Sequence, residues 1–142
     1  AQCDLAVASE VASFATSGIH YGLFCSTPSV PLVRNVSAKR AMEMLVTGDF
    51  IDAATALNEG LVNRVVPLDG LDAEVEKLVR SIVEKPRAAV AMGKALVYRQ
   101  RELGLEAAYQ LAGQTMAVNM MDEAAQEGAR AFAEKRTPGW KS

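Results

Sequence analysis

The chain contains one histidine, His20, within the stretch SFATSGIHYG at residues 13–22. Two hydroxyl residues, Thr16 and Ser17, precede it, and glycines lie on both sides. An imidazole in such a segment is a candidate general acid or base, because its pKa lies near neutral pH. The alternative is a polar, partly buried side chain where a strand passes into a loop. Both interpretations stay open, and the residue types favour the second.

A thiol and a hydroxyl, Cys25 and Ser26, follow along the chain and are candidate nucleophiles. A nucleophile needs an activating base, and His20 is the only histidine that can supply one. The other cysteine is Cys3. Two cysteines without histidines at ligand spacing form neither a disulfide framework nor a metal site. We therefore expect two buried, reduced thiols and no bound metal.

Length and composition restrict the class of protein. The 142 residues suit one domain; half of them are hydrophobic and 23% are charged. The formal net charge of −2 provides no basic surface for nucleic acid, and no apolar run is long enough to span a membrane. We expect neither partner. The opening AQCDLAVAS has the pattern of a strand within a protein, so we expect the chain to be a fragment.

The elements that must position these residues are strands first and helices afterwards. Two β-prone runs, DLAVAS and VASFAT, lie within residues 4–16. Residues 17–36 are rich in Gly, Ser, Thr and Pro, and a long irregular loop is expected there. Pro28 and Pro31 argue against a regular helix through residues 24–31.

Helical patterns dominate from residue 37 onward. Ser37 is a suitable N-cap for a helix that ends near Thr47. The predicted buried face of this helix consists of Ala41, Met44 and Leu45. The later elements are a short helix capped by Asp52, a strand within 61–67, and helices over 69–84, 86–100, 104–120 and 124–136. The last helix is expected to place Lys135 and Arg136 in its final turn, where cations suit the helix dipole.

A longer motif lies at residues 47–67, TGDFIDAATALNEGLVNRVVP. It resembles the TGD-x-I-x-A-x-x-A-x-x-x-GLV-x-x-V-x-P signature of the crotonase, or enoyl-CoA hydratase/isomerase, family. Three further segments resemble family motifs in the same order: CDLAVAS at 3–9, SAKRAMEML at 37–45 and EGARAFAEKRTPGW at 127–140. Glycines and alanines of the signature end helices and let them pack closely, so it marks a fold and not a set of catalysts.

The resemblance implies an α/β, crotonase-like fold, which is a ClpP-type spiral of ββα units. Residues 1–142 would be the C-terminal part of one such domain. Residues 1–36 would supply strands and the active-site loop, and residues 37–142 would be mainly helical. The C-terminal helices of the family mediate trimer contacts, so a homotrimer or a hexamer is implied. We expect a cytoplasmic protein, or a mitochondrial one in a eukaryotic host.

The resemblance also implies a chemistry. Family members polarise the carbonyl of a CoA thioester with two backbone N–H groups, which stabilise an enolate. In the hydratases two glutamates handle water and protons. The oxyanion-hole donors and the first glutamate precede the CD strand in the family. The second glutamate follows F-A-x-P; here Gly18 stands at its position and Ser17 at that of the proline. Hydratase chemistry is therefore expected to be altered or lost, and His20 is left as the candidate substitute.

The loop at residues 22–36, GLFCSTPSVPLVRNV, is similar to that of the enoyl-CoA hydratase domain-containing protein 3 branch of the family, which also lacks the second glutamate. The resemblance implies that Tyr21, Phe24 and Cys25 line an acyl pocket. It further implies that Lys135 meets the CoA phosphates; core or solvated positions are the alternatives for all four. CoA enters as part of the substrate, and no separate cofactor is implied. Three functions stay open: an acyl-CoA-handling hydratase/isomerase, a non-catalytic acyl-CoA-binding or regulatory homologue, and a thioesterase- or isomerase-type enzyme.

Overall fold

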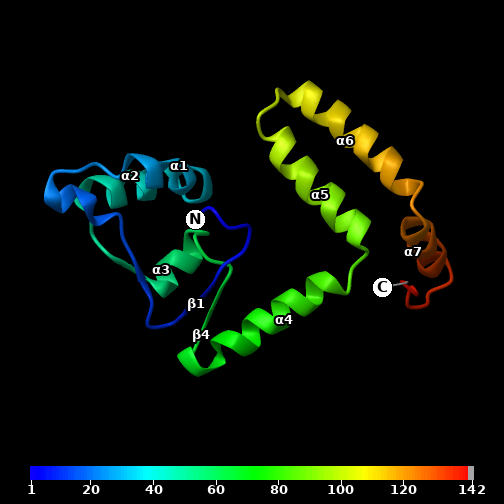
Figure 1. Ribbon diagram of the computed structural model, residues 1–142, viewed down its shortest axis with the longest axis horizontal. Helices are drawn as coiled ribbons and strands as arrows, with labels where there is room; N and C mark the ends of the chain where they lie inside the picture. The colour runs from blue at the N-terminus through cyan, green and yellow to red at the C-terminus, as the bar shows by residue number, and fades with distance from the viewer. Residues whose placement is uncertain (141–142) are drawn as a thin grey trace. The chain divides into compact units, whose positions relative to one another are not determined.

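Short strands and helices alternate in the first part of the chain, and helices alone make up the rest (Figure 1). The structure, a computed structural model, describes residues 1–140. The chain divides into two compact units, residues 1–77 and 78–142. The residues expected near an acyl chain lie in the first unit, and the expected phosphate contact lies in the second.

Two small sheets hold the first unit together. They pair β1 (Val7–Ser9) in parallel with β4 (Arg64–Val66), and β2 (Ser13–Phe14) antiparallel with β3 (Ile51–Asp52). The parallel pair joins segments far apart in the sequence, and the helices between them form the crossover that parallel strands require. Strands therefore form in the predicted N-terminal and central segments.

Helix α2 (Ala38–Thr47) lies in the core of the first unit. At its N-terminus the Ser37 hydroxyl accepts a hydrogen bond from the Arg40 backbone N–H at 3.4 Å. Gly48 ends the helix in the left-handed conformation, with φ 73°. The buried face is the predicted one: Ala41, Met44 and Leu45. The core around this face consists of Ala8, Leu32, Val36, Ile51, Ala56 and Val62.

Helix α3 (Ala53–Asn58) begins at Asp52, as the sequence predicts. The Asp52 carboxylate accepts a hydrogen bond from the Thr55 N–H at 2.8 Å. Hydrogen bonding by Thr55 favours the charged form and lowers the pKa of the Asp52 carboxyl. Gly60 follows at φ 79°, a conformation that strains other residues, and the chain then returns to β4 beside β1.

The segment expected to be an irregular loop is largely helical, so that expectation is wrong. It forms a 3₁₀ helix, η1 (Ser17–Tyr21), and an α-helix, α1 (Ser26–Asn35), that contains both prolines. Pro28 lies in the first turn of α1, where a backbone N–H would have no partner within the helix. Pro31 lies inside the helix and removes one hydrogen bond. Burial of Leu32 in the core, where it is 4% exposed, offsets that loss.

The remaining helices follow the predicted order. They are α4 (Leu71–Val83), α5 (Arg87–Gln100), α6 (Leu105–Met120) and α7 (Glu123–Ala133), with a short 3₁₀ turn, η2 (Leu68–Gly70), before α4. Helices α5 and α6 lie side by side as an antiparallel pair, and α7 contacts α6 (Figure 1). None of the helices within residues 1–140 has both the length and the apolar character needed to cross a lipid bilayer.

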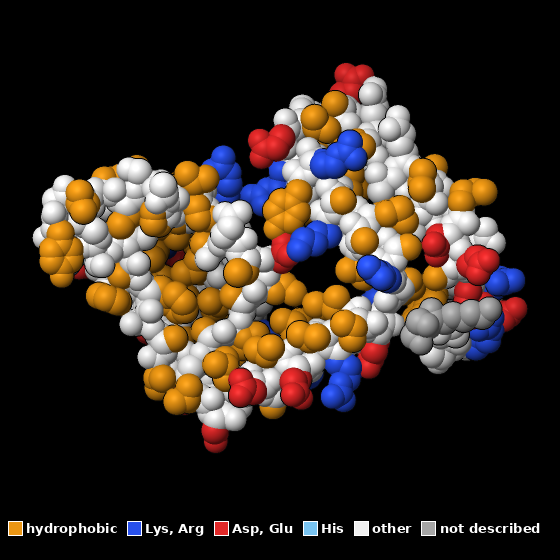
Figure 2. Space-filling view, in the orientation of Figure 1, with side chains coloured by type: hydrophobic (Ala, Val, Ile, Leu, Met, Phe, Trp, Pro, Cys, Tyr) orange, Lys and Arg blue, Asp and Glu red, His pale blue; other side chains and the backbone are white. Residues whose placement is uncertain are grey.

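Apolar side chains are exposed over the helices (Figure 2). The valines Val75, Val79 and Val83 recur every four residues along α4, and each is at least 40% exposed. On α6 the exposed apolar side chains include Leu105, Tyr109 and Met116. A stripe at helical spacing is the pattern that a second protein surface covers.

Replacing Leu45 by alanine is expected to lower the free energy of unfolding by about 2–5 kcal/mol, because the change leaves a cavity. The Leu45 side chain is 2% exposed, whereas Val46, next to it on α2, is 52% exposed. Val46→Ala is therefore the control, with an expected change below about 0.5 kcal/mol. Urea denaturation followed by circular dichroism measures both. Equal losses in the two variants would contradict this description of the core.

Candidate functional site

His20 lies against the C-terminal end of α2. Its Nε2 is 2.9 Å from the Thr47 carbonyl oxygen, and the Thr16 hydroxyl donates to the Met44 carbonyl at 2.7 Å. A carbonyl oxygen can only accept, so Nε2 donates, and Nδ1 of the neutral ring is left as the acceptor. Both carbonyls belong to the last turn of the helix; the Met44 carbonyl also accepts the Gly48 N–H at 3.0 Å, and the Thr47 carbonyl lies beyond the last hydrogen bond within the helix. The histidine therefore fastens η1 to α2.

The turn after α2 leaves room for the imidazole. A Cβ at Gly48 would collide with the His20 ring and would lie 2.8 Å from Cγ2 of Ile19. The turn itself is closed by Thr47, whose Oγ1 accepts a hydrogen bond from the Asp49 N–H at 3.1 Å. The TGD segment of the signature thus forms the surface on which His20 rests. The sequence motif did not reveal this contact, because its two sides are far apart in the chain.

The space beside Gly18 is filled. A Cβ at this residue would lie 2.7 Å from the Leu23 carbonyl oxygen and 2.8 Å from Cys25 Sγ. Real side chains do not tolerate such distances, and the carbonyl belongs to the backbone. The Leu23 N–H donates to the Gly18 carbonyl at 3.0 Å, which holds the following loop over η1. Any side chain at residue 18 would require this loop to move.

The three residues expected to line an acyl pocket have different environments. Tyr21 is 83% exposed and Phe24 is 48% exposed. Cys25 is only partly exposed and packs against the hydrophobic core at the start of α1. The two aromatic rings are therefore open to a ligand, whereas the thiol serves mainly in packing.

The other thiol, Cys3, is exposed and Cys25 is only half-buried, so the expectation of two buried thiols is wrong. Cys3 precedes β1 in a segment, residues 1–5, that is exposed throughout and receives no cover from the core. Among residues 1–140, no three or more histidine, cysteine and acidic side chains are grouped so as to hold a metal ion.

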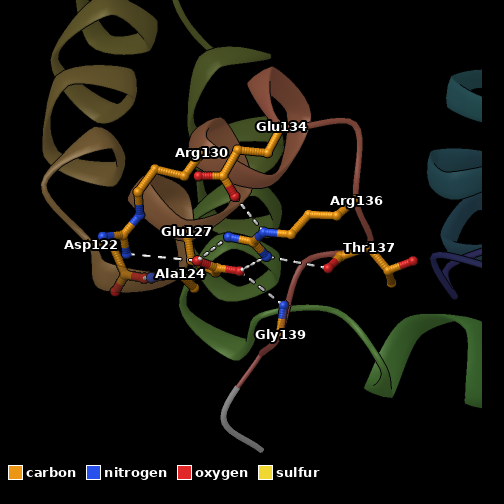
Figure 3. Close-up of polar contacts among 8 residues, drawn as sticks. All are labelled: Asp122, Ala124, Glu127, Arg130, Glu134, Arg136, Thr137 and Gly139. Carbon is orange, nitrogen blue, oxygen red and sulfur yellow. Dashed lines mark hydrogen bonds and ion pairs between the residues drawn. The ribbon is translucent and has the colours of Figure 1, made fainter.

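Glu127 on α7 is the centre of a polar cluster in the second unit (Figure 3). Its two oxygens accept hydrogen bonds from both terminal nitrogens of Arg136, at 2.6 and 3.2 Å. The Gly139 N–H donates to the same carboxylate at 3.1 Å, and Arg130 lies 3.6 Å away. The hydrogen bonds from Arg136, followed by that from Gly139, lower the pKa of Glu127 to about 2. These contacts hold residues 136–139, which follow α7, against Glu127 of that helix.

Lys135 lies outside α7 and not in its last turn. The helix ends at Ala133, and Lys135 has φ 54°, a left-handed conformation that costs a non-glycine residue roughly 1–2 kcal/mol. The Arg136 N–H donates to the Ala131 carbonyl at 3.0 Å. The Lys135 N–H donates to the Phe132 carbonyl at 3.2 Å, and the two bonds form a Schellman motif. The expectation of a final-turn position is wrong because this motif ends the helix earlier.

The charge on Glu127 is expected to stabilise the fold near neutral pH and to stop doing so in acid. The folded pKa of about 2 lies below the ordinary value of 4.5, so the stabilisation is complete above pH 4.5 and is lost as the pH falls toward 2. Thermal unfolding should show Glu127→Gln melting below the wild type at pH 7 and together with it near pH 2. Because solvent screens the partly exposed carboxylate, the difference in melting temperature between the variant and the wild type should be small.

The control for that series is Glu123→Gln, which removes a carboxylate from the same helix outside the cluster. Its melting temperature should follow the wild type across the whole pH range. A gap in Glu123→Gln as large as that in Glu127→Gln would contradict the assignment to the cluster.

Gly18→Glu is expected to lower the free energy of unfolding by roughly 1–3 kcal/mol, because overpacking forces backbone to shift. The backbone in question is the Leu23 carbonyl, 2.7 Å from the new Cβ. Gly70→Glu is the control, since nothing lies within 4 Å of a Cβ there. Urea denaturation compares the two, and equal stabilities would mean that the loop over η1 moves aside at no cost.

Comparisons with known proteins agree with the described fold. A family model described as Enoyl-CoA hydratase/isomerase matches residues 1–142. The chain is 49% identical over 140 residues to a mouse (Mus musculus) protein named enoyl-CoA hydratase domain-containing protein 3, mitochondrial. It is 47% identical to the human (Homo sapiens) protein of that name. These matches cover 99% of this chain but 47% and 46% of the two proteins, so the chain spans about half the length of these curated relatives.

Solved structures give the same result. An enoyl-CoA hydratase from Mycobacterium smegmatis matches with a TM-score of 0.95 and 62% identity, over 99% of this chain and 55% of that one. Human enoyl-CoA hydratase domain-containing protein 3 matches with a TM-score of 0.91 and 47% identity, over 97% and 55%. The predicted α/β, crotonase-like fold and the resemblance to this branch are confirmed. The chain therefore belongs to the enoyl-CoA hydratase/isomerase, or crotonase, family.

Proposed function

We propose that this protein handles acyl-CoA thioesters and that it does so without a side-chain acid or base at residue 18. Membership of the family supports the substrate class. The observation that carries the second part is the filled space beside Gly18. The Leu23 carbonyl and the Cys25 sulfur occupy the direction that a side chain would take. The crowding around Gly18 supports the proposal that no carboxylate acts from this position.

The proposed chemistry begins with the step that family members share. Two backbone N–H groups in the full-length protein would polarise the thioester carbonyl and stabilise an enolate. Hydration of a double bond also needs groups that deliver and remove protons. A glycine has no such group. We therefore expect hydratase turnover well below that of a protein with both glutamates.

We do not assign the missing acid/base role to His20. Its Nε2 donates to the Thr47 carbonyl, and its ring lies on Gly48. These contacts account for the histidine as the residue that holds η1 on α2. We propose that it positions the segment that carries Gly18 and that it takes no direct part in proton transfer.

A non-catalytic acyl-CoA-binding or regulatory homologue is the second candidate, and the filled space beside Gly18 favours it as well. A protein that keeps its binding surfaces and lacks a proton-transfer group retains affinity and loses turnover. A thioesterase- or isomerase-type enzyme is the third candidate. It would use the oxyanion hole together with a base from another part of the full-length protein.

We propose binding residues within each unit, and each set is taken by itself, with no single site implied between the units. In the first, the exposed rings of Tyr21 and Phe24 would contact the acyl part of the ligand, with Cys25 behind them against the core. In the second, the exposed ammonium of Lys135 would meet the CoA phosphates. CoA enters as part of the substrate, so the proposal needs no separate cofactor.

We also propose that the protein forms homotrimers or hexamers. The stripe of Val75, Val79 and Val83 on α4 supports this proposal, because association would remove exposed apolar area from water. The mouse and human relatives are named as mitochondrial. In a eukaryotic host we propose the same compartment, and in a bacterial host a cytoplasmic one.

Binding and turnover measured on one full-length preparation test the proposal. Calorimetry with butyryl-CoA should detect binding, and crotonyl-CoA should be hydrated at no more than a small multiple of the buffer rate. His20→Ala should bind like the wild type, provided that its circular dichroism spectrum is unchanged. Tyr21→Ala should weaken binding, whereas Tyr109→Ala, which removes a ring that is 73% exposed on α6, is the control.

Each result distinguishes the candidates. If neither butyryl-CoA nor crotonyl-CoA binds detectably, the proposed substrate class is wrong. Rapid hydration that His20→Ala abolishes would overturn the positioning role of the histidine. Thioester hydrolysis or double-bond migration without hydration would select the third candidate over the second.

A further inference from the structure

We propose that Glu127 is a positioning residue for Lys135: through Arg136 and Gly139 it fixes the turn that presents the lysine ammonium to an anionic group of CoA. This inference rests on the proposed function of Lys135 and adds a residue to it. Glu127 lies on α7, before the turn that follows this helix. In this inference its carboxylate acts without contacting the ligand.

The contacts of the turn carry the inference (Figure 3). The residue directly after Lys135 is Arg136, whose guanidinium donates two parallel hydrogen bonds to Glu127. Such bidentate pairs fix orientation as well as distance. The Gly139 N–H donates to the same carboxylate. One side chain therefore holds residues 136–139 at two points, while Lys135 itself is exposed.

The conformation of Lys135 shows why the turn needs this support. A lysine with φ 54° persists only where the surrounding structure determines its backbone. The Schellman bonds act on the helix side of Lys135, and the Glu127 contacts act on the other side. Farther along, the Trp140 ring packs on Gly128, where a Cβ would lie 3.2 Å from the ring.

The charges of the cluster leave the lysine as the cation that a ligand would meet. Arg136 is paired with Glu127 and with Glu134, and Arg130 also lies beside Glu127. The two acidic and two basic side chains of this set balance one another. Within residues 1–140 no ion pair involves the Lys135 ammonium, so its charge is directed to solvent.

Calorimetric titration of the full-length protein with CoA tests the inference. Lys135→Ala is expected to raise the Kd about tenfold, as the loss of one charge-assisted contact does. Glu127→Gln is expected to raise it about fivefold, although it makes the protein more positive by one charge. If the carboxylate acted only as a nearby negative charge, the same variant would bind CoA more tightly. The two explanations therefore predict changes of opposite sign.

The double variant isolates the route of the effect. If Glu127 acts through Lys135, the double variant should have the Kd of Lys135→Ala alone. Glu123→Gln is the matched control on the same helix and should bind like the wild type. Arg136→Lys keeps the positive charge but loses the two parallel hydrogen bonds to Glu127. It should raise the Kd as Glu127→Gln does. If Glu127→Gln does not fold, Arg136→Lys takes its place in the experiment.

The outcomes separate this inference from the proposed function. If Lys135→Ala binds CoA like the wild type, the proposed role of the lysine is wrong and the inference falls with it. If Lys135→Ala weakens binding but Glu127→Gln matches Glu123→Gln or binds more tightly, the inference alone is overturned. Losses that multiply in the double variant would also overturn it, because they would show an effect independent of the lysine.

Discussion

The first unit depends on how the C-terminal end of α2 is completed. Gly48 turns the chain in a left-handed conformation, and its missing side chain admits the His20 ring. The Thr47 carbonyl accepts a hydrogen bond from the His20 imidazole, and the Met44 carbonyl accepts one from the Thr16 hydroxyl. These contacts tie η1, and with it the segment around residue 18, to the helix that contributes Ala41, Met44 and Leu45 to the core. His20, for which the sequence left a catalytic and a structural role open, thus makes a structural contact between η1 and α2.

Local rules were sufficient for α2 and insufficient for α1. A serine cap, a glycine stop and apolar residues at helical spacing lie within one short segment, so they predicted both ends and the buried face of α2. For α1 the same rules failed, because the cost of a proline depends on its place in the helix. Pro28 falls in the first turn, and the cost of Pro31 is offset by burial of Leu32 against residues that the local sequence does not identify.

The sequence supplied candidate site residues but not their arrangement in space. The resemblance predicts that Gly18 stands at the position of a family glutamate, and the fold adds that atoms of Leu23 and Cys25 lie where a side chain there would begin. His20 and Thr47 are 27 residues apart, and Glu127 and Arg136 are 9 apart. Neither separation belongs to the i,i+3 or i,i+4 spacings from which side-chain pairs are predicted on helices.

The loop over η1 also bears on how this protein can change over generations. Any glycine codon becomes an aspartate or a glutamate codon by a single nucleotide change, so one mutation could place a carboxylate at residue 18. The Leu23 carbonyl stands in the way of the new side chain, so the loop that contains it would have to move. A glutamate introduced beside the present loop is therefore expected to lower stability. A substitution that the genetic code permits in one step is therefore one that the loop over η1 opposes.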